Sequence, residues 1–235
     1  MAVRLLFPYY VFHRNLLQED LPDGVGVNQE YMELLVRTIY DMRKKDPKGR
    51  QISNAYTGWQ SNDGCDSNPA FMKLCKQIEK LFDDEVKPFH GLYKPEHNMR
   101  VVVGNMWANI NDHIAWNKPH MHNGCWYSGV FYIKADGDEG RFEAMDVMPK
   151  VVSDFPSSER TGSSWGLPPT RGELVVFPSA LMHMVEPNLT KKDRYSVSFN
   201  VEVKNFGKEY HGKVKNYNPD EFVFDVDTLG NPILR

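Results

Sequence analysis

Apolar residues recur three or four positions apart in two stretches of the N-terminal part of the chain, which is the spacing of one face of an α-helix. The first stretch runs from Val27 to about Lys45 and is ended by helix breakers in 46–49. The second opens with Asn68-Pro69, an N-cap residue followed by proline at the first helical position, and continues toward Pro88. The pattern predicts two amphipathic helices, each burying one apolar stripe. Between them, the polar and aromatic segment 53–61 has no period and predicts an ordered loop.

After residue 98 the pattern becomes that of short β-strands, because runs rich in Val, Phe, Tyr and Ile alternate with turn residues. The predicted strands are 100–110, 125–135, 141–147, 174–179 and 195–203. Strands that follow helices favour an α+β fold, and antiparallel strands at this spacing are typical of a jelly roll, also called a double-stranded β-helix. We therefore expect a jelly roll with the N-terminal helices packed on its outside.

The predicted elements divide a single structural domain into three regions. Residues 1–98 are expected to form a helical support, 99–204 the jelly-roll core and 205–235 a C-terminal extension. Within the extension, 222–227 is a candidate edge strand. The segment 147–171 combines Pro, Ser and Gly without a period and is long for a loop in a compact domain, which is typical of a lid or binding loop.

Alternation along two strands predicts which side chains enter the lumen of the jelly roll. The last strand carries Arg194, Ser196, Ser198 and Asn200 on one face and Tyr195, Val197, Phe199, Val201 and Val203 on the other. The apolar face can pack against the helices, which directs Arg194 into the lumen, where a buried guanidinium needs an anion. An earlier strand is expected to carry Ser128, Val130, Tyr132 and Lys134 on one face. Tyr132 is therefore predicted to reach the same lumen.

Three histidines form a candidate metal site. His120 and His122 are one residue apart on an extended segment, so both rings are expected to point to the same side. His183 follows a later β-rich run and can supply the third ligand. Three imidazoles beside an arginine, a serine and a tyrosine predict a mononuclear metal site next to a pocket for a small dianion. Trp107 and Asn109, on the strand before the histidine pair, either line the substrate pocket or simply pack.

Charge and cysteine content narrow the classes of partner. The 235 residues contain 28 Lys and Arg against 31 Asp and Glu, so no basic field indicates nucleic acid. No apolar run has the length of a membrane span, and the N-terminus lacks the features of a signal peptide. Cys65, Cys75 and Cys125 are odd in number and lack zinc-finger spacing, which predicts reduced thiols in a cytoplasmic protein. The oligomeric state has no readable signal, and a homodimer stays open.

The order of these motifs resembles the iron(II)- and 2-oxoglutarate-dependent oxygenases, in particular a bacterial and phage branch that carries a His-x-His pair. The resemblance covers most of the chain from about residue 53 to residue 203. The motifs that carry it are Gly58-Trp59-Gln60-Ser61, His120-x-His122, Ser128-Gly129-Val130-Phe131-Tyr132, Gly172-Glu173-Leu174-Val175-Val176-Phe177-Pro178-Ser179, His183 and Arg194-x-Ser196.

The resemblance implies an oxidoreductase, a dioxygenase that uses iron(II) as metal and 2-oxoglutarate as cosubstrate. The implied iron ligands are His120, His122 and His183, and the implied 2-oxoglutarate contacts are Arg194 on the distal carboxylate, Ser196, Tyr132 and Ser128. Oxidative decarboxylation with molecular oxygen would yield succinate and CO2, and a primary substrate that the sequence does not identify would be hydroxylated.

One position departs from the usual pattern, because His122 stands where the metal triad of these enzymes has Asp or Glu. Three neutral imidazoles leave the iron site more positive than a triad that contains a carboxylate. His122 is then either the third ligand or a residue behind the metal. In the second case Asp136, Asp138, Glu143 or water completes the coordination.

Two other classes of protein fit parts of the pattern. Cupin-type metalloenzymes that do not use 2-oxoglutarate also combine a His-x-His pair with a late histidine on a jelly roll. The glutamate that a cupin carries a few positions after the pair is missing from 123–127. A non-catalytic jelly-roll binding protein with a vestigial metal site would not need Arg194 in the lumen. Binding of 2-oxoglutarate to the iron-loaded protein separates these classes.

Overall fold

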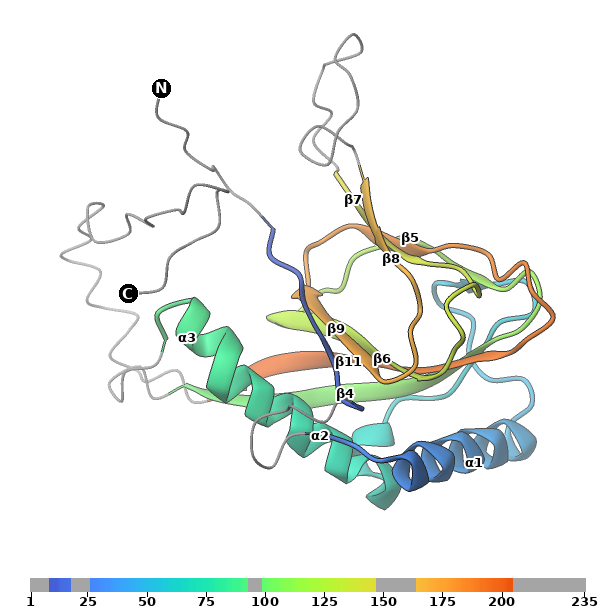
Figure 1. Cartoon of the computed structure of the whole chain (residues 1–235), viewed down its shortest axis with the longest axis horizontal. Coiled ribbons are helices and arrows are strands. Elements are labelled where there is room, and N and C mark those ends of the chain that lie inside the picture. Colours follow the sequence, from blue (N-terminus) through green and yellow to red (C-terminus); the bar gives the residue numbers. More distant parts are fainter. Residues whose placement is uncertain (1–8, 18–25, 93–98, 147–163, 205–235) are drawn as a thin grey trace, which may run out of the picture.

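The computed structural model describes residues 9–17, 26–92, 99–146 and 164–204 (Figure 1). Most of the predicted lid, 147–163, lies outside these residues. The predicted C-terminal extension, 205–235, with its candidate edge strand also lies outside them.

Both predicted helices form, and each begins after an asparagine cap. α1 (Gln29–Lys45) follows Asn28, whose Oδ1 accepts the N–H of Tyr31 at 2.9 Å. α2 (Pro69–Leu81) follows Asn68, whose Oδ1 accepts the N–H of Ala70 at 3.0 Å. Side-chain caps of this kind satisfy N–H groups that have no partner within the helix. The remaining helical turns are a 3-10 turn at Cys65–Ser67, a π-helical turn at Phe82–Val86 and α3 (Lys87–Phe89).

The strands form two antiparallel sheets that face each other as a double-stranded β-helix (Figure 1). The six-stranded sheet has the order β1 (Phe12–Asn15), β9 (Glu173–Pro178), β6 (Tyr127–Lys134), β11 (Arg194–Lys204), β4 (Arg100–Asn111) and β3 (Trp59–Gln60). The five-stranded sheet has the order β2 (Asn54–Ala55), β5 (Trp116–His120), β10 (His183–Val185), β7 (Phe142–Met145) and β8 (Ser164–Leu167). The predicted α+β jelly roll is confirmed.

Three strands lie in the region where only helices and a loop are predicted. β1 pairs with β9 at the edge of the larger sheet, whereas β2 and β3 pair with β5 and β4. Segment 53–61 is therefore partly strand, and the prediction of a loop missed this because strands of two residues carry no readable period. Both sheets contain residues from the first 98, and the boundaries at 98 and 204 stay a prediction.

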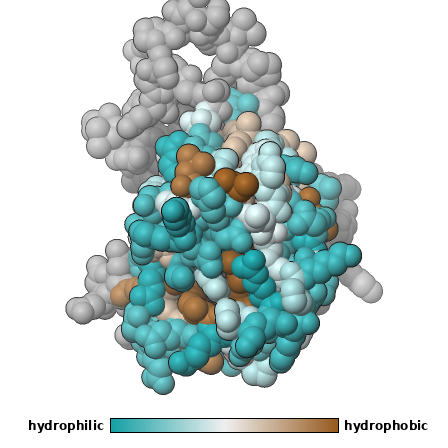
Figure 2. All heavy atoms as spheres, turned by 90° about the vertical axis from the view of Figure 1, so that its right-hand side faces the viewer, coloured by the Kyte–Doolittle hydropathy of each residue, from teal (hydrophilic) through white to brown (hydrophobic). Residues whose placement is uncertain are grey.

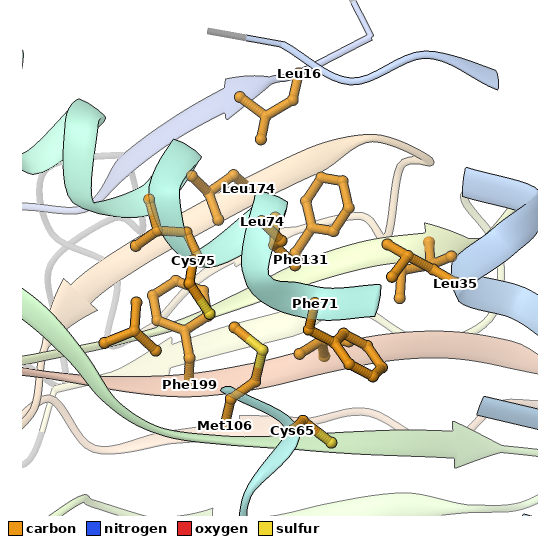
Figure 3. Packing of buried hydrophobic residues seen from close by; sticks show 14 of the residues in the cluster. Leu16, Leu35, Cys65, Phe71, Leu74, Cys75, Met106, Phe131, Leu174 and Phe199 are labelled. Atoms are coloured by element: carbon orange, nitrogen blue, oxygen red, sulfur yellow. The ribbon is translucent and has the colours of Figure 1, made fainter. Parts of the chain in front are cut away.

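The outer face of the six-stranded sheet is covered by α1 and α2, which lie along β4 and β11 (Figure 1). Phe199 on β11 is completely buried there with Leu35 of α1 and Phe71 of α2 (Figure 3). Val197 belongs to the same buried cluster. Gly129 on β6 leaves room for the Phe199 ring, because a Cβ atom at position 129 would lie 2.4 Å from that ring. The helices thus pack against the six-stranded sheet on the side away from the lumen.

A second, smaller apolar cluster lies between the two sheets. Its buried members are Tyr132, Ala135, Phe142, Val175, Phe177 and Leu181. These side chains fill only part of the lumen, and the rest is a cavity lined by polar and apolar side chains. The face of β11 that points into this lumen carries Arg194, Ser196 and Ser198, as the alternation predicts.

A β-bulge in β6 changes which side chains share one face of this strand. Tyr195 of β11 pairs with Lys134, but the next residue, Ser196, pairs with Tyr132, which leaves Ile133 as an extra residue. Tyr132 therefore points into the lumen while Lys134 points outward, where its Nζ lies 5.2 Å from the centre of the Tyr195 ring. The prediction that Lys134 shares the face of Tyr132 is wrong, because a bulge shifts the alternation by one residue.

A second bulge lies in β5, directly before the histidine pair. His183 pairs with His120 and Val185 pairs with Asn117, so two steps along β10 match three steps along β5. The extra length lies at Lys118-Pro119, and proline suits this place because it has no N–H to donate to the sheet. As a result, both Asn117 and His120 line the lumen cavity.

The surface at the right-hand end of Figure 1 is mostly hydrophilic and carries small, separate apolar patches (Figure 2). Scattered apolar side chains of this kind are normal for a folded domain. No helix in the described part of the chain is long and apolar enough to cross a membrane.

Candidate active site

The three predicted histidines meet in the lumen. His120 is the last residue of β5, His122 lies two residues further on, and His183 is the first residue of β10, directly opposite His120. One ring nitrogen from each histidine lies within 4.8 Å of the others, which is the geometry of a group that can hold a metal ion. The sheet register therefore joins residues that are far apart in the sequence.

Each of the three rings is oriented by a hydrogen bond from its Nδ1. His120 Nδ1 lies 2.6 Å from the carbonyl oxygen of Lys118, and His183 Nδ1 lies 2.9 Å from that of Leu181. A carbonyl oxygen can only accept, so in both residues Nδ1 carries the proton and Nε2 keeps its lone pair. His122 Nδ1 lies 2.8 Å from Oδ1 of Asn200, which accepts in the same way.

Burial keeps the three imidazoles neutral. Loss of solvation, together with the neighbouring imidazoles, lowers the pKa of His122 to about 4 and that of His183 to about 3. Burial also lowers the pKa of His120. A neutral imidazole with a free Nε2 is the form that binds a metal ion, so the cluster is ready for a metal at neutral pH.

The carboxylates considered as alternative ligands lie elsewhere. Asp136 and Asp138 are exposed, and Lys192 lies 2.9 Å from the first and 3.9 Å from the second. Glu143 pairs with Met184 on β10, next to His183, so its side chain points to the opposite side of the sheet from the histidine. Within the described residues, the group of possible metal ligands contains histidines alone.

Arg194, the first residue of β11, lies at the other end of the cavity and is only 2% exposed. Its Nη1 donates to the carbonyl oxygens of Glu139 and Gly140 at 2.9 and 2.8 Å. Its Nε is buried and has no hydrogen-bond partner among the described residues. Burial lowers the pKa of Arg194, but no carboxylate in the described part of the chain forms an ion pair with it.

Tyr132 adds a second unpaired polar atom to this end. Its hydroxyl is buried and has no partner among the described residues, although its ring lies 5.9 Å from the guanidinium carbon of Arg194. Leaving two buried donors unpaired costs free energy unless something else occupies the site. The arrangement therefore fits a small anion bound between Arg194 and Tyr132.

A tight turn between β6 and β7 holds Arg194 in place, and sequence reasoning missed it. The Glu139 carboxylate is 1% exposed and accepts the N–H groups of Asp136 and Gly137. Gly140 has a φ of +87°, and a Cβ atom there would lie 2.2 Å from the Glu186 carbonyl oxygen. This turn presents two backbone carbonyls to the arginine, and backbone acceptors leave no residue-type signal in a sequence.

The remaining predicted contacts divide between the two ends of the cavity. Ser196 lines the cavity beside Arg194. Ser128 is buried, and its hydroxyl donates to Oδ1 of Asn200 at 2.9 Å, next to His122 and away from the arginine. Trp107 lines the cavity with its ring stacked against His122 at a centroid distance of 5.7 Å. Asn109 also lines the cavity and donates to Ser198 at 3.0 Å.

The comparison with known families agrees with this geometry. Residues 105–200 match the family model 2OG-FeII_Oxy_5, described as "Putative 2OG-Fe(II) oxygenase". The matched segment runs from β4 to β11 and contains the three histidines and Arg194. No curated protein matches the sequence.

Solved structures with the same fold cover most of the chain at low sequence identity. A prolyl hydroxylase from Trichoplax adhaerens, in complex with a peptide of the hypoxia inducible factor oxygen degradation domain, is 10% identical, with a TM-score of 0.55 and coverage of 88% of this chain and 87% of that one. The epimerase SnoN from nogalamycin biosynthesis is 10% identical, with a TM-score of 0.53 and coverage of 95% and 90%. HygX from Streptomyces hygroscopicus, solved with nickel and 2-oxoglutarate, is 12% identical, with a TM-score of 0.51 and coverage of 82% of both chains.

These structural neighbours confirm the jelly-roll fold. The family match over residues 105–200 points to chemistry with iron(II) and 2-oxoglutarate. One of the structural neighbours is a hydroxylase and another an epimerase, so the fold does not identify a substrate. The three free Nε2 atoms fit a metal ion, and the unpaired donors of Arg194 and Tyr132 fit a carboxylate. The segment that carries these residues, 105–200, is thus similar to the 2OG-Fe(II) oxygenases, oxidoreductases that use iron(II) and 2-oxoglutarate.

Proposed function

We propose that this protein is a dioxygenase that hydroxylates a primary substrate while converting 2-oxoglutarate to succinate and CO2. The observation that carries the proposal is the pairing, in one lumen, of three imidazoles with free Nε2 atoms and a buried guanidinium without a counter-anion. A metal ion completes the first group and a dicarboxylate completes the second. A cupin that does not use 2-oxoglutarate would leave Arg194 without a purpose.

In this proposal His120, His122 and His183 hold the iron. Their Nδ1 hydrogen bonds orient the rings before the metal arrives, so little orientational freedom is lost on binding. When bound, iron(II) with 2-oxoglutarate and oxygen supplies oxidative decarboxylation and transfer of one oxygen atom to the substrate.

Arg194 is proposed to bind the distal carboxylate of 2-oxoglutarate. The turn at 136–140 holds Nη1, which leaves other guanidinium N–H groups, including Nε, for the anion. Tyr132 donates its hydroxyl to the same carboxylate, and Ser196 lies on the adjacent stretch of β11. Arg194 is almost fully buried, so the contact forms away from water, where charge-assisted hydrogen bonds are strongest.

The apolar part of the lumen protects the reaction from water. Phe142 stacks on His183 at a centroid distance of 5.4 Å, and the tilted Phe177 ring lies 4.5 Å from it. Val130 lines the same cavity from β6. These side chains have no polar atoms that could hold water in the cavity.

The proposal is tested by anaerobic titration of the iron(II)-loaded protein with 2-oxoglutarate. Chelation through the keto and proximal carboxylate groups is expected to produce a visible metal-to-ligand charge-transfer band. Admission of oxygen is then expected to release succinate and CO2, slowly without the primary substrate. An iron-loaded protein that shows neither a spectral nor a calorimetric response to millimolar 2-oxoglutarate would instead favour the cupin-type or the non-catalytic alternative.

We further propose a cytoplasmic location, a monomer or homodimer, and a supporting role for residues 1–98 around the core 99–204. The location rests on cysteines that are free in the structure, two of them buried. The supporting role rests on the helices that cover β4 and β11 and on the strands that enter both sheets. Cell fractionation, light scattering and expression of truncated chains test these three points separately.

A further inference from the structure

We propose that Asn200 is a positioning residue for the third metal ligand: it holds His122 in the form that binds metal, and Ser128 holds Asn200. This inference rests on the proposed function, because it gives the His122 ring a metal to face. Asn200 lies on β11, the same strand that begins with Arg194. One strand would therefore serve both the metal and the cosubstrate.

His122 depends on a distant side chain in a way that the other two histidines do not. The acceptors for His120 and His183 are the carbonyls of Lys118 and Leu181, each two residues earlier in the chain, so local backbone geometry supplies them. The acceptor for His122 is the side chain of a residue 78 positions away. A single substitution can therefore remove the orientation of His122 and leave the other two rings unchanged.

His122 also has little support from the sheets. It lies beyond the end of β5, and its backbone N–H donates to the Ser179 carbonyl at 2.9 Å. Trp107 contacts one face of its ring. These contacts limit where the ring lies, but neither of them selects which of its two nitrogens carries the proton. The hydrogen bond to Asn200 Oδ1 does so, because it places the proton on Nδ1.

The orientation of the Asn200 amide determines which nitrogen of His122 carries the proton. With Oδ1 toward His122, the Nδ1 proton has an acceptor and Nε2 is free for the metal. With the amide reversed, its NH2 group would donate to Nδ1, and the ring proton would move to Nε2, where it blocks coordination. The Ser128 hydroxyl also lies on Oδ1, at 2.9 Å, and Ser128 is completely buried. In the structure both hydrogen bonds end on Oδ1, which is the amide orientation that leaves Nε2 free.

The test compares metal affinity and ring tautomer in Asn200→Ala, Asn200→Asp and Asn105→Ala. Asn105 is the matched control, because it stands directly opposite Asn200 on β4 and its amide donates to Asp63, not to a histidine. Affinity for iron(II) alone is measured anaerobically by competition with a chelator. The tautomer of His122 is observed by long-range nitrogen-proton correlation in metal-free protein.

Asn200→Ala is expected to weaken iron affinity by about 10- to 100-fold, the usual cost of losing an outer hydrogen-bond partner. The His122 signal should change from the Nδ1-protonated form to a mixture of both tautomers. Asn200→Asp restores an acceptor and should restore both properties, whereas Asn105→Ala should bind iron like the parent protein. Iron affinity and tautomer that stay unchanged in Asn200→Ala would overturn the proposal, as would a loss in Asn200→Asp equal to that in Asn200→Ala.

Ser128→Ala provides a second test in case Asn200→Ala does not fold. As a positioning residue, Ser128 should affect iron affinity by a smaller factor of the same sign and leave 2-oxoglutarate affinity unchanged once iron is saturating. A fall in 2-oxoglutarate affinity at unchanged iron affinity would instead make Ser128 a cosubstrate contact, and this inference would fail. The proposed function fails by a different result, the absence of any 2-oxoglutarate response in the iron-loaded parent protein.

Discussion

The two ends of the lumen differ in how completely their polar groups are paired. At the histidine end, every Nδ1 has an oxygen partner, supplied by Lys118, Leu181 or Asn200. At the arginine end, Arg194 Nε and the Tyr132 hydroxyl are buried without a partner among the described residues. Both ends are enclosed by the same two sheets, so burial alone does not explain the difference.

The difference matches the charge of what each end is proposed to bind. A cation needs lone pairs held in fixed directions, and hydrogen bonds on the far side of each ring provide this. An anion needs donors that are not already engaged, so its site keeps them unpaired at a cost in stability. Substitutions at the two ends should therefore have separable effects, on metal affinity at one and on 2-oxoglutarate affinity at the other.

His183→Ala should have the largest effect. It removes the most buried of the three imidazoles and leaves two ligands, so iron affinity should fall by more than the ~100-fold upper range for losing an outer partner. Elemental analysis after gel filtration measures the bound iron. The control is His113→Ala, because His113 is exposed and its Nδ1 bonds to the Thr190 carbonyl, away from the cluster. Full iron occupancy in His183→Ala would show that the ligand assignment is wrong.

Arg194→Ala should act on the other end and leave iron affinity unchanged. Removing a charge-assisted contact from a dry site costs about 2–5 kcal/mol, or roughly 30- to several thousand-fold in 2-oxoglutarate affinity. Arg194→Lys should recover little, because a point charge does not reproduce the planar guanidinium. The charge-transfer titration measures both. Arg141→Ala is the control, since that arginine pairs with Glu186 at the surface, and an equal loss there would refute the assignment.

Acidification should destabilise the metal-free protein through the histidine end. The pKa of His183 is lowered by burial from 6.5 to about 3. Below pH 6.5 His183 is protonated in the unfolded chain but stays neutral in the folded protein. The free energy of unfolding is therefore unaffected by this residue above pH 6.5 and decreases as the pH falls from 6.5 to about 3, the pKa of His183 in the folded protein. For this 4% exposed residue the loss is about 1.4 kcal/mol per pH unit, or about 2 kcal/mol at pH 5. Denaturant unfolding of chelator-treated protein measures it, and a His183→Ala variant with the same pH slope would contradict this source.

Tyr132→Phe should have the smallest effect, and it should change stability and 2-oxoglutarate affinity in opposite directions. It removes a buried hydroxyl that has no partner in the described structure, so the protein without 2-oxoglutarate should become more stable by about 1 kcal/mol. The same change should weaken 2-oxoglutarate binding by roughly 10-fold, the cost of one hydrogen bond to a charged group. Thermal unfolding with and without cosubstrate measures both. A variant destabilised in both states would mean that the hydroxyl has another role.

Features set by a single element were predictable from the sequence. Helix caps at Asn28 and Asn68 depend on the next three residues only, and the faces of β11 follow from strict alternation over a regular stretch. Arg194 was found this way. The His-x-His pair and His183 were found because metal ligands come from few residue types. Asn200 carried a usable signal as well, since it shares the lumen face of Arg194, but amides on a strand suggest no particular chemistry.

Features set by two elements together were not predictable. Lys134 points outward because of a bulge that exists only in the pairing of β6 with β11. The acceptors for Arg194 are carbonyls, which every residue has, so the turn at 136–140 is invisible until the chain is folded. The position of Glu143 likewise depends on its register against β10.

The bulge at Lys118-Pro119 has a consequence for how a metal can be held inside a sheet. In a regular ladder, backbone carbonyls are engaged with the neighbouring strands, and a histidine on such a strand has none available beside it. Lys118 occupies no paired position on either neighbour of β5, and its carbonyl is the one that orients His120. Leu181, the counterpart for His183, lies before β10 begins. The bulge in β5 and the segment before β10 thus each supply the acceptor that orients one ring, and a β5 strand without the bulge would lose the acceptor for His120 although every metal ligand was kept.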